Sequence, residues 1–448
     1  MGLSLALEEQ GVPTVPVHTH VFARLAKATA LAGGRPSLRN CFVPQPVVGA
    51  SPEQLRGYIY GTDPVSQRPF IQEMIDALTA PLSDDDLKGA SFERSTPRLL
   101  EPDSEDNLRE LFKRSRWTDF LPIILPTEQR VEAMLKGTSH GADRIVGRLR
   151  PTAFRESWEF DVEKVAVNAV MAGARPEYFP VILAMASSGI TARSSSTTSF
   201  STISLINGPI REELGMNDGI GAMGPYDEAS ATIGRAHGLL SQNLQGGSTP
   251  GETYMGSLGN WLAYTACFPE AEERSPWAPF HVDQGFRPSD STVSLFFGGW
   301  YTESGYGPRE TWQSKFIRCL TALEQFLPPL IVMDPLVARG FVELGFTKEK
   351  LIEWCAENAR LKARDYWDDM AIQTLIRPHA VAGVEPFASR LKADPDELIQ
   401  IFRPEDIHIV VTGGETQAAF KMFGGRYAIG ARGTANPMKP TILIDDWR

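Results

Sequence analysis

The sequence predicts an α/β protein made of a partial unit at the N-terminus and a larger mixed α/β domain. Strand-like and helix-like stretches alternate between residues 290 and 344, which is typical of a sheet covered by helices. Before residue 63 only one or two such repeats occur, and a parallel sheet needs several repeats to bury both of its faces. A polar, turn-rich segment separates the two regions. We therefore expect a partial α/β unit at 1–62, a surface connector at 63–104 and a large α/β domain at 105–448.

The N-terminal unit begins with one strand and one helix. Alternating β-branched residues predict a strand over 11–19, and apolar residues at helical spacing predict a helix over 21–32. A second extended segment is expected at 43–48. Ser51 followed by Pro52 marks the start of another helix, because serine caps helix N-termini and proline suits the first turn. Since this is too little for an independent sheet, we expect the rest of the unit to come from elsewhere.

The large domain shows the alternation most clearly. Apolar spacing and capping residues predict helices at 107–113, 127–136, 162–172, 177–187, 229–241, 309–326 and 336–344. Short apolar runs predict strands at 122–126, 201–206, 290–300, 329–334 and 407–412. Gly413 and Gly414 follow the last strand, and ligands of α/β proteins usually bind at the carboxyl ends of strands.

Composition and charge exclude several classes of function. The 448 residues include 44 Lys and Arg against 55 Asp and Glu, and 42% are hydrophobic, as in an ordinary folded protein. The net charge of −11, without a basic cluster, excludes nucleic acid and anionic membranes as main partners. No apolar stretch approaches the roughly 20 residues of a membrane-spanning helix, and no signal peptide is recognisable, so we expect a cytoplasmic protein. The four cysteines lack CxxC spacing and read as reduced thiols.

Hydroxyl, amide and guanidinium side chains gather between residues 189 and 259. Ser195 and Ser196 lie in a Ser- and Thr-rich stretch that leads through a predicted strand to Asn207 and Arg211. Such side chains suit a small polar or carboxylated substrate, because guanidinium offers a bidentate fork and hydroxyls add donors. The alternative is a low-complexity surface loop.

The Gly- and Asn-rich frame that follows adds further candidates. The substrate-binding residues expected there are Asn217, Arg235 and Asn243. Arg235 is alternatively an exposed position on its predicted helix. Neither GxGxxG nor a P-loop motif occurs in this region, so we expect no nucleotide cofactor.

Two further groups of residues suggest catalysis or metal binding. Glu273 and His281 follow Cys267 in an acidic segment and are candidate proton-transfer residues. His18 and His20 form an HxH pair at a predicted strand end, where both rings lie on one face as metal ligands do. A pair of surface histidines is the alternative, because no second cluster of ligands accompanies them.

Long segments of the chain resemble one bacterial family. The stretch LEEQGVPTVPVHTHVFARLAKATA resembles the end of the cysteine- or selenocysteine-containing domain of the UGSC-motif proteins. The segments similar to the long companion region of that family are 117–135, 163–184, 207–217, 231–236, 272–282 and 406–415. The selenoprotein component of glycine reductase is a more distant relative of the family.

The departures from the family pattern shape what the resemblance implies. The chain contains no Gly-Ser-Cys, and His18 stands where the family strand commonly has cysteine. The resemblance therefore implies a partial flavodoxin-like unit completed by a partner, a small subunit that carries a CGSC- or UGSC-type motif. The cofactor would be the cysteine or selenocysteine of that partner, with a metal ion as a further possibility.

By the same analogy, the chain is expected to be the large subunit of a two-component thiol- or selenol-dependent enzyme, an oxidoreductase or lyase. It would cleave or reduce a carbon–heteroatom bond in a small polar organic substrate. The alternatives are thiol-mediated sulfur transfer in a biosynthetic pathway and a non-catalytic binding or scaffold subunit.

Overall fold

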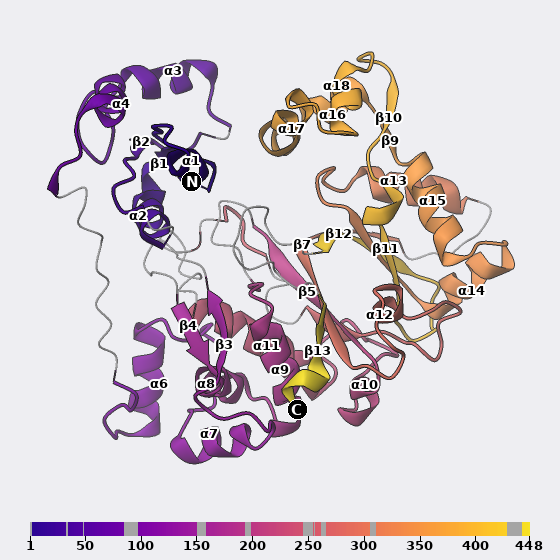
Figure 1. Ribbon diagram of the computed structural model, residues 1–448. Helices are drawn as coiled ribbons and strands as arrows, with labels where there is room; N and C mark the ends of the chain where they lie inside the picture. Colours follow the sequence, from indigo (N-terminus) through magenta and orange to yellow (C-terminus); the bar gives the residue numbers. More distant parts are fainter. Residues whose placement is uncertain are drawn as a thin grey trace.

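The computed structural model confirms an α/β fold with a mixed central sheet (Figure 1). The structure describes residues 2–32, 35–47, 49–84, 97–149, 158–192, 199–244, 254, 256–260, 266–304, 311–427 and 441–448. Among these residues, no helix is both long and apolar enough to cross a membrane.

The N-terminal unit is built on two short parallel strands. Strands β1 (Val17–Thr19) and β2 (Cys41–Val43) pair so that His18 lies opposite Phe42. The helices of this unit are α1 (Gly2–Glu9), α2 (Ala23–Ala32), α3 (Pro52–Tyr60) and α4 (Phe70–Thr79). Ser51 caps α3 as predicted: its Oγ accepts a hydrogen bond from the Gln54 amide.

Helix α4 lies where only a connector was expected. Its Phe70 is fully buried and packs with Cys41 and Val43 of β2 in a small apolar core. The segment after residue 62 therefore contributes structure to the N-terminal unit, because it supplies the side chain that covers the strand.

The large sheet has the strand order β11-β8-β12-β7-β5-β6, with β13 also paired to β7. Its strands are β5 (Ser201–Asn207), β6 (Cys267–Pro269), β7 (Thr292–Ser304), β8 (Pro329–Met333), β11 (His408–Val411), β12 (Phe420–Tyr427) and β13 (Thr441–Leu443). The pairs β5–β6 and β8–β11 are parallel, and the other pairs are antiparallel. The predicted strands near 201, 290, 329 and 407 are confirmed.

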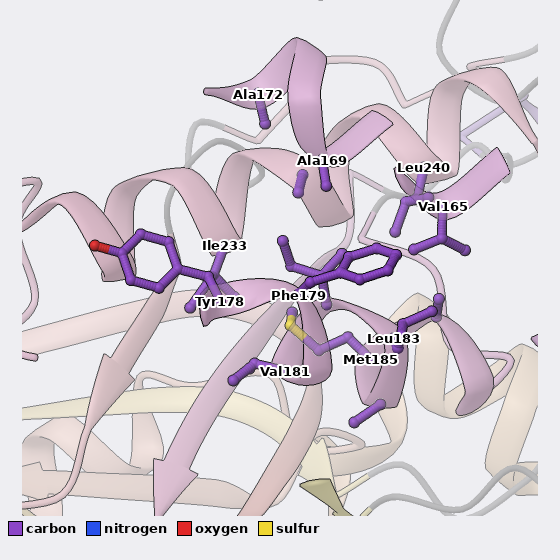
Figure 2. Close-up of a cluster of buried hydrophobic side chains, with 14 of the residues drawn as sticks. Val165, Ala169, Ala172, Tyr178, Phe179, Val181, Leu183, Met185, Ile233 and Leu240 are labelled. Carbon is purple, nitrogen blue, oxygen red and sulfur yellow. The ribbon is translucent and has the colours of Figure 1, made fainter. Parts of the chain in front are cut away.

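Helices cover one face of this sheet in two groups. The first group contains α6 (Glu105–Arg114), α7 (Glu128–Leu135), α8 (Val162–Ala172), α9 (Phe179–Ser187) and α11 (Glu228–Asn243). Residues 179–186 of α9 are all buried, as expected for a helix with no polar face. Figure 2 shows Phe179, Leu183 and Ile233 within this cluster. Asp161 caps the start of α8, and Gly173 ends it in the left-handed conformation that glycine favours.

The second helical group packs around β8 and β11. It is centred on α13 (Trp312–Thr321), α14 (Pro335–Glu343) and α15 (Lys348–Asn358), with Phe316 and Phe341 in its core. The described chain also has the hairpin β3 (Ile145–Leu149) and β4 (Trp158–Asp161), and the pair β9 (Arg360–Lys362) and β10 (Leu398–Gln400). Shorter helices are α10 (Ile210–Glu213), α12 (Phe280–Asp283), α16 (Ala363–Asp368), α17 (Arg377–Val381) and α18 (Phe387–Lys392).

The predicted strand at 122–126 is wrong. This stretch has no strand structure and runs along the helical layer, where the Ile124 amide donates to the Met171 carbonyl at 3.4 Å. Its apolar residues Ile123 and Leu125 are buried against helices rather than in the sheet. An apolar run bounded by prolines fits such a covering segment as well as it fits a strand.

The opposite face of the sheet encloses a separate apolar core. Residues of β5, β7, β8 and β12 alternate, so that Ile203, Phe296 and Leu330 point away from the helical groups. Phe268 of β6 and Val410 of β11 join this same core, although these strands lie at the two ends of the strand order. The Ala271 amide also donates to the Val411 carbonyl at 2.8 Å. The sheet is therefore curled, with its two edge strands brought together.

Candidate functional site

A mostly buried polar cluster lies where β5 and β6 end. We call it the Glu270 cluster and define it as Asn207, Arg211, Glu270, Glu272, Glu273 and His281. Because β5 and β6 are parallel neighbours, the residues that end them or follow them meet at one edge of the sheet. Four of the residues singled out from the sequence, Asn207, Arg211, Glu273 and His281, are brought together here.

Glu270 is the most deeply placed carboxyl of the cluster. Its Oε2 accepts hydrogen bonds from Asn207 Nδ2 at 2.6 Å and from the Phe280 amide at 2.8 Å. Its Oε1 is buried without a hydrogen-bond partner. Burial raises the pKa of Glu270 to about 7, against a smaller opposing effect of Lys348 and of these hydrogen bonds. A carboxyl with such a pKa can give or take a proton near neutral pH.

Asn207 connects two of the carboxyl groups. Its Nδ2 donates to Glu270 Oε2 and to Glu272 Oε1, the latter at 2.9 Å, while its Oδ1 has no partner. Thr292 lies directly opposite Asn207 in the β5–β7 ladder, so both side chains are on the same face of the sheet. The Thr292 hydroxyl is also buried without a partner.

The guanidinium of Arg211 is already hydrogen-bonded to acceptors within the protein. Its guanidinium donates to Glu273 Oε1 at 2.7 Å and to the backbone carbonyl of Glu270 at 2.7 Å. Its Nε lies 3.0 Å from Glu272 Oε1 and 3.0 Å from the Gly208 carbonyl. An anionic substrate group would therefore compete with two carboxylates for this arginine. The sequence alone did not reveal these partners.

Glu273 and His281 differ in their surroundings. The Glu273 side chain is 56% exposed, and its hydrogen bond with Arg211 lowers its pKa, which favours the ionised form. His281 is fully buried, and Nδ1 lies 3.8 Å from Glu272 Oε1, beyond hydrogen-bond distance. Neither ring nitrogen of His281 has a hydrogen-bond partner. His281 therefore offers two free polar atoms inside the cluster, whereas Glu273 is held in an ion pair.

The rim of the cluster is formed by Asp218, Arg274 and the loop after β11. Arg274 donates to Asp218 Oδ1 at 2.9 Å and to the Gly413 carbonyl at 2.6 Å. The Gly-rich end of this strand, expected to border a site, does contact the site region. Asn217 does not face the cluster through its amide: its Nδ2 donates to the Ile220 carbonyl and its Oδ1 accepts from the Gly219 amide, which closes a turn.

Arg235 and Asn243 lie elsewhere, in the helical layer on α11. Arg235 makes two hydrogen bonds of 3.0 Å to the buried carboxylate of Asp119. Asn243 donates to the Trp117 carbonyl at 2.9 Å and to Asn168 Oδ1 at 2.8 Å. These contacts join α11 to neighbouring segments, and the structure does not bring the two residues to the Glu270 cluster. Ser195 and Ser196 lie outside the described residues.

The histidine pair belongs to the N-terminal unit. His18 is in β1 and His20 begins the short 3-10 helix (His20–Phe22) that follows it. Burial lowers the pKa of His18, with a smaller contribution from the chain N-terminus. Within the described part of the chain, no group of three or more His, Cys, Asp or Glu side chains is arranged to hold a metal ion. A metal at His18 and His20 stays a prediction.

A hollow of about 630 Å³ also lies in the N-terminal unit, beside β2 and α4. Its lining includes Arg39 and Arg68, which are engaged by the protein: Arg39 donates to the Ala80 carbonyl at 2.7 Å, and Arg68 pairs with Glu73 at 2.9 Å. We therefore regard the Glu270 cluster, with its unpartnered polar atoms, as the stronger candidate site.

The comparison with known proteins relates only the N-terminal unit to a family. The model of the UGSC family matches residues 3–62, which contain α1, β1, α2, β2 and α3. No curated protein and no solved structure matches the chain. The match supports the resemblance expected for this segment. Residues 3–62 of this chain are therefore similar to the UGSC family.

Proposed function

We propose that this chain is the larger subunit of a two-component enzyme that cleaves or reduces a carbon–heteroatom bond in a small polar organic molecule. In this proposal a thiol or selenol on a small partner subunit, within a CGSC- or UGSC-type motif, attacks the substrate. The observation that carries the proposal is the UGSC family match over residues 3–62 in a chain without Gly-Ser-Cys.

The cysteines of this chain support a thiol supplied from outside it. Burial, with the nearby carboxylates of Asp63 and Glu73, raises the pKa of Cys41 to about 11. Burial also raises the pKa values of Cys267, Cys319 and Cys355. Because the thiolate is the reactive form, none of these four cysteines is set up as a nucleophile at neutral pH.

The Glu270 cluster supplies the proton chemistry that such a cleavage needs. As the partner sulfur or selenium forms a bond to the substrate carbon, the bond from that carbon to the heteroatom breaks and its electron pair leaves with the heteroatom. A side chain of the cluster then gives a proton to the leaving heteroatom. This step requires no added reductant and leaves the organic fragment on the partner.

The test is covalent capture on the partner. The full chain would be produced together with a small Gly-Ser-Cys-type chain encoded beside it, and the complex treated with small compounds that contain carbon–nitrogen, carbon–oxygen or carbon–sulfur bonds. We expect the intact mass of the partner to rise by one organic fragment. A partner whose motif cysteine is serine should gain no mass, and a Cys319→Ser variant of this chain should leave the gain unchanged. Failure to form a complex, or an adduct on this chain instead, would refute the proposal.

A non-catalytic scaffold subunit is the second candidate. It is favoured by the internal pairing of Arg211 and Arg235, which leaves these expected substrate ligands engaged with Glu273 and Asp119. A scaffold predicts that the partner forms the adduct at the same rate without this chain. The catalytic proposal predicts a slower rate in that case.

A further inference from the structure

The proposed reaction needs one carboxyl group that carries a proton, and the Glu270 cluster contains three carboxyl groups. Glu272 accepts hydrogen bonds on Oε1 from Asn207 and from the Gly208 amide at 2.7 Å, and Arg211 lies beside it. Glu273 is paired with Arg211 and is the most exposed of the three. The hydrogen bond with Arg211 lowers the pKa of Glu273 and favours its ionised form, whereas Glu272 already uses Oε1 to accept N–H donors.

Glu270 differs because its two oxygens have different surroundings. Oε2 receives two N–H donors, whereas Oε1 is buried and has none. Asn207 carries the complementary free atom: its Nδ2 already donates to Oε2, and its Oδ1 has no partner. A proton on Glu270 Oε1 could therefore be shared with Asn207 Oδ1, as in the paired hydrogen bonds of a carboxylic acid and an amide.

Further polar atoms beside this pair are buried and free. The Thr292 hydroxyl lies across the ladder from Asn207, and both ring nitrogens of His281 lack partners. Buried polar groups are normally hydrogen-bonded, so free ones that gather at a strand end indicate a place where a polar group is received.

We propose that Glu270, rather than Glu273, holds the transferable proton of the site on Oε1, with Asn207 as its positioning residue. The inference rests on the proposed function for the identity of the reaction. In that reaction the Oε1 proton passes to the leaving heteroatom and Glu270 becomes a carboxylate. The charged groups that act on Glu270 are Lys348, on α15, and Glu272, and they oppose each other.

Infrared titration of the full chain tests the proton directly, without partner or substrate. The wild type should show the carbonyl absorption of a buried carboxylic acid that disappears with a midpoint near pH 7. Glu270→Gln should lose this signal. Glu273→Gln should keep it, and so should Glu110→Gln, which changes an exposed carboxylate paired with Lys113. A signal that survives in Glu270→Gln, or vanishes in Glu273→Gln, would overturn the inference.

Asn207 is tested through the carbonyl absorption of the Glu270 acid. Asn207→Ala removes the Nδ2 donor to Oε2, so this absorption should move to higher frequency. Thr292→Val, which removes a hydroxyl that does not bond to Glu270, should leave the frequency in place. An unchanged frequency in Asn207→Ala would refute the positioning role.

The two proposals fail separately. If no adduct forms on any partner but the titration follows Glu270, the proposed function fails and the proton assignment stands. If the adduct forms equally fast with Glu270→Gln, the proposed function stands and Glu270 is not the proton donor.

Discussion

The protonated state of Glu270 makes the stability of the large domain depend on pH. Burial raises the pKa of this carboxyl from an unfolded value of 4.5 to about 7 in the folded protein. The folded state thus binds the proton more tightly, so its stabilising contribution is complete below the unfolded pKa and is lost as the pH rises through 7. Linkage between these two values gives a loss on the order of 2 to 3 kcal/mol between about pH 5 and about pH 8.

Comparison with Glu270→Gln isolates this contribution from all other titrations. Glutamine has the shape of the neutral acid but carries no charge at any pH, so its stability lacks the pH-dependent loss. Urea unfolding followed by tryptophan fluorescence should therefore show the free energy of unfolding of the wild type falling by roughly 2 to 3 kcal/mol more than that of the variant over that pH interval. Glu110→Gln should behave like the wild type. If the difference between wild type and Glu270→Gln is the same at both ends of the interval, Glu270 is not a buried neutral acid.

Three further predictions concern backbone, ion pair and thiol. In thermal unfolding, Gly208→Ala should lower the stability of the protein by about 2 kcal/mol or more, because an added Cβ would lie 2.1 Å from the Asp290 carbonyl oxygen. Gly215 also has a positive φ, but the space around it is open, so Gly215→Ala should lower the stability by only about 1 kcal/mol. Asp119→Ala should lower the free energy of unfolding, measured with urea, by about 3 kcal/mol, because the Arg235 guanidinium loses its carboxylate partner. A decrease of less than about 1 kcal/mol would contradict this. Cys41 should resist a thiol reagent in the native protein and react after unfolding; rapid native reaction would contradict its raised pKa.

The parts of the fold that the sequence predicts best are those set by local pattern. The strands at 329–333 and 408–411 are recognisable as short apolar runs, and α8 is recognisable from its apolar spacing and from Gly173. The segment 122–126 shows the limit of such patterns. Whether an extended apolar run pairs in a sheet or covers helices depends on neighbours that are distant in sequence.

In the candidate site, too, some features follow from local sequence and others depend on residues that are distant in sequence. Asn207 and Glu273 come together because one ends β5 and the other follows β6, its parallel neighbour, and β6 is a strand that the sequence analysis did not predict. The partner of Arg235 is Asp119, 116 residues away, and no spacing rule indicates that pair. Glu270 and Glu273 are three residues apart in one acidic segment, yet one is fully buried and the other exposed. Only the packing of α12 and β5 around Glu270 distinguishes the proton carrier from the ion-pair partner.

The curl of the large sheet also decides where another chain could add a strand. Sheet edges normally offer free backbone N–H and C=O groups to a partner, but all three residues of β6 are buried, as are Ile409–Val411 of β11. Strand addition at these two edges is therefore blocked by the protein itself. The pair β1–β2 differs, since Val17 of β1 is exposed and the other two residues of that strand are only partly buried. A partner that adds a strand would therefore meet more exposed residues at β1 than at β6 or β11, in the unit whose residues 3–62 are similar to the UGSC family.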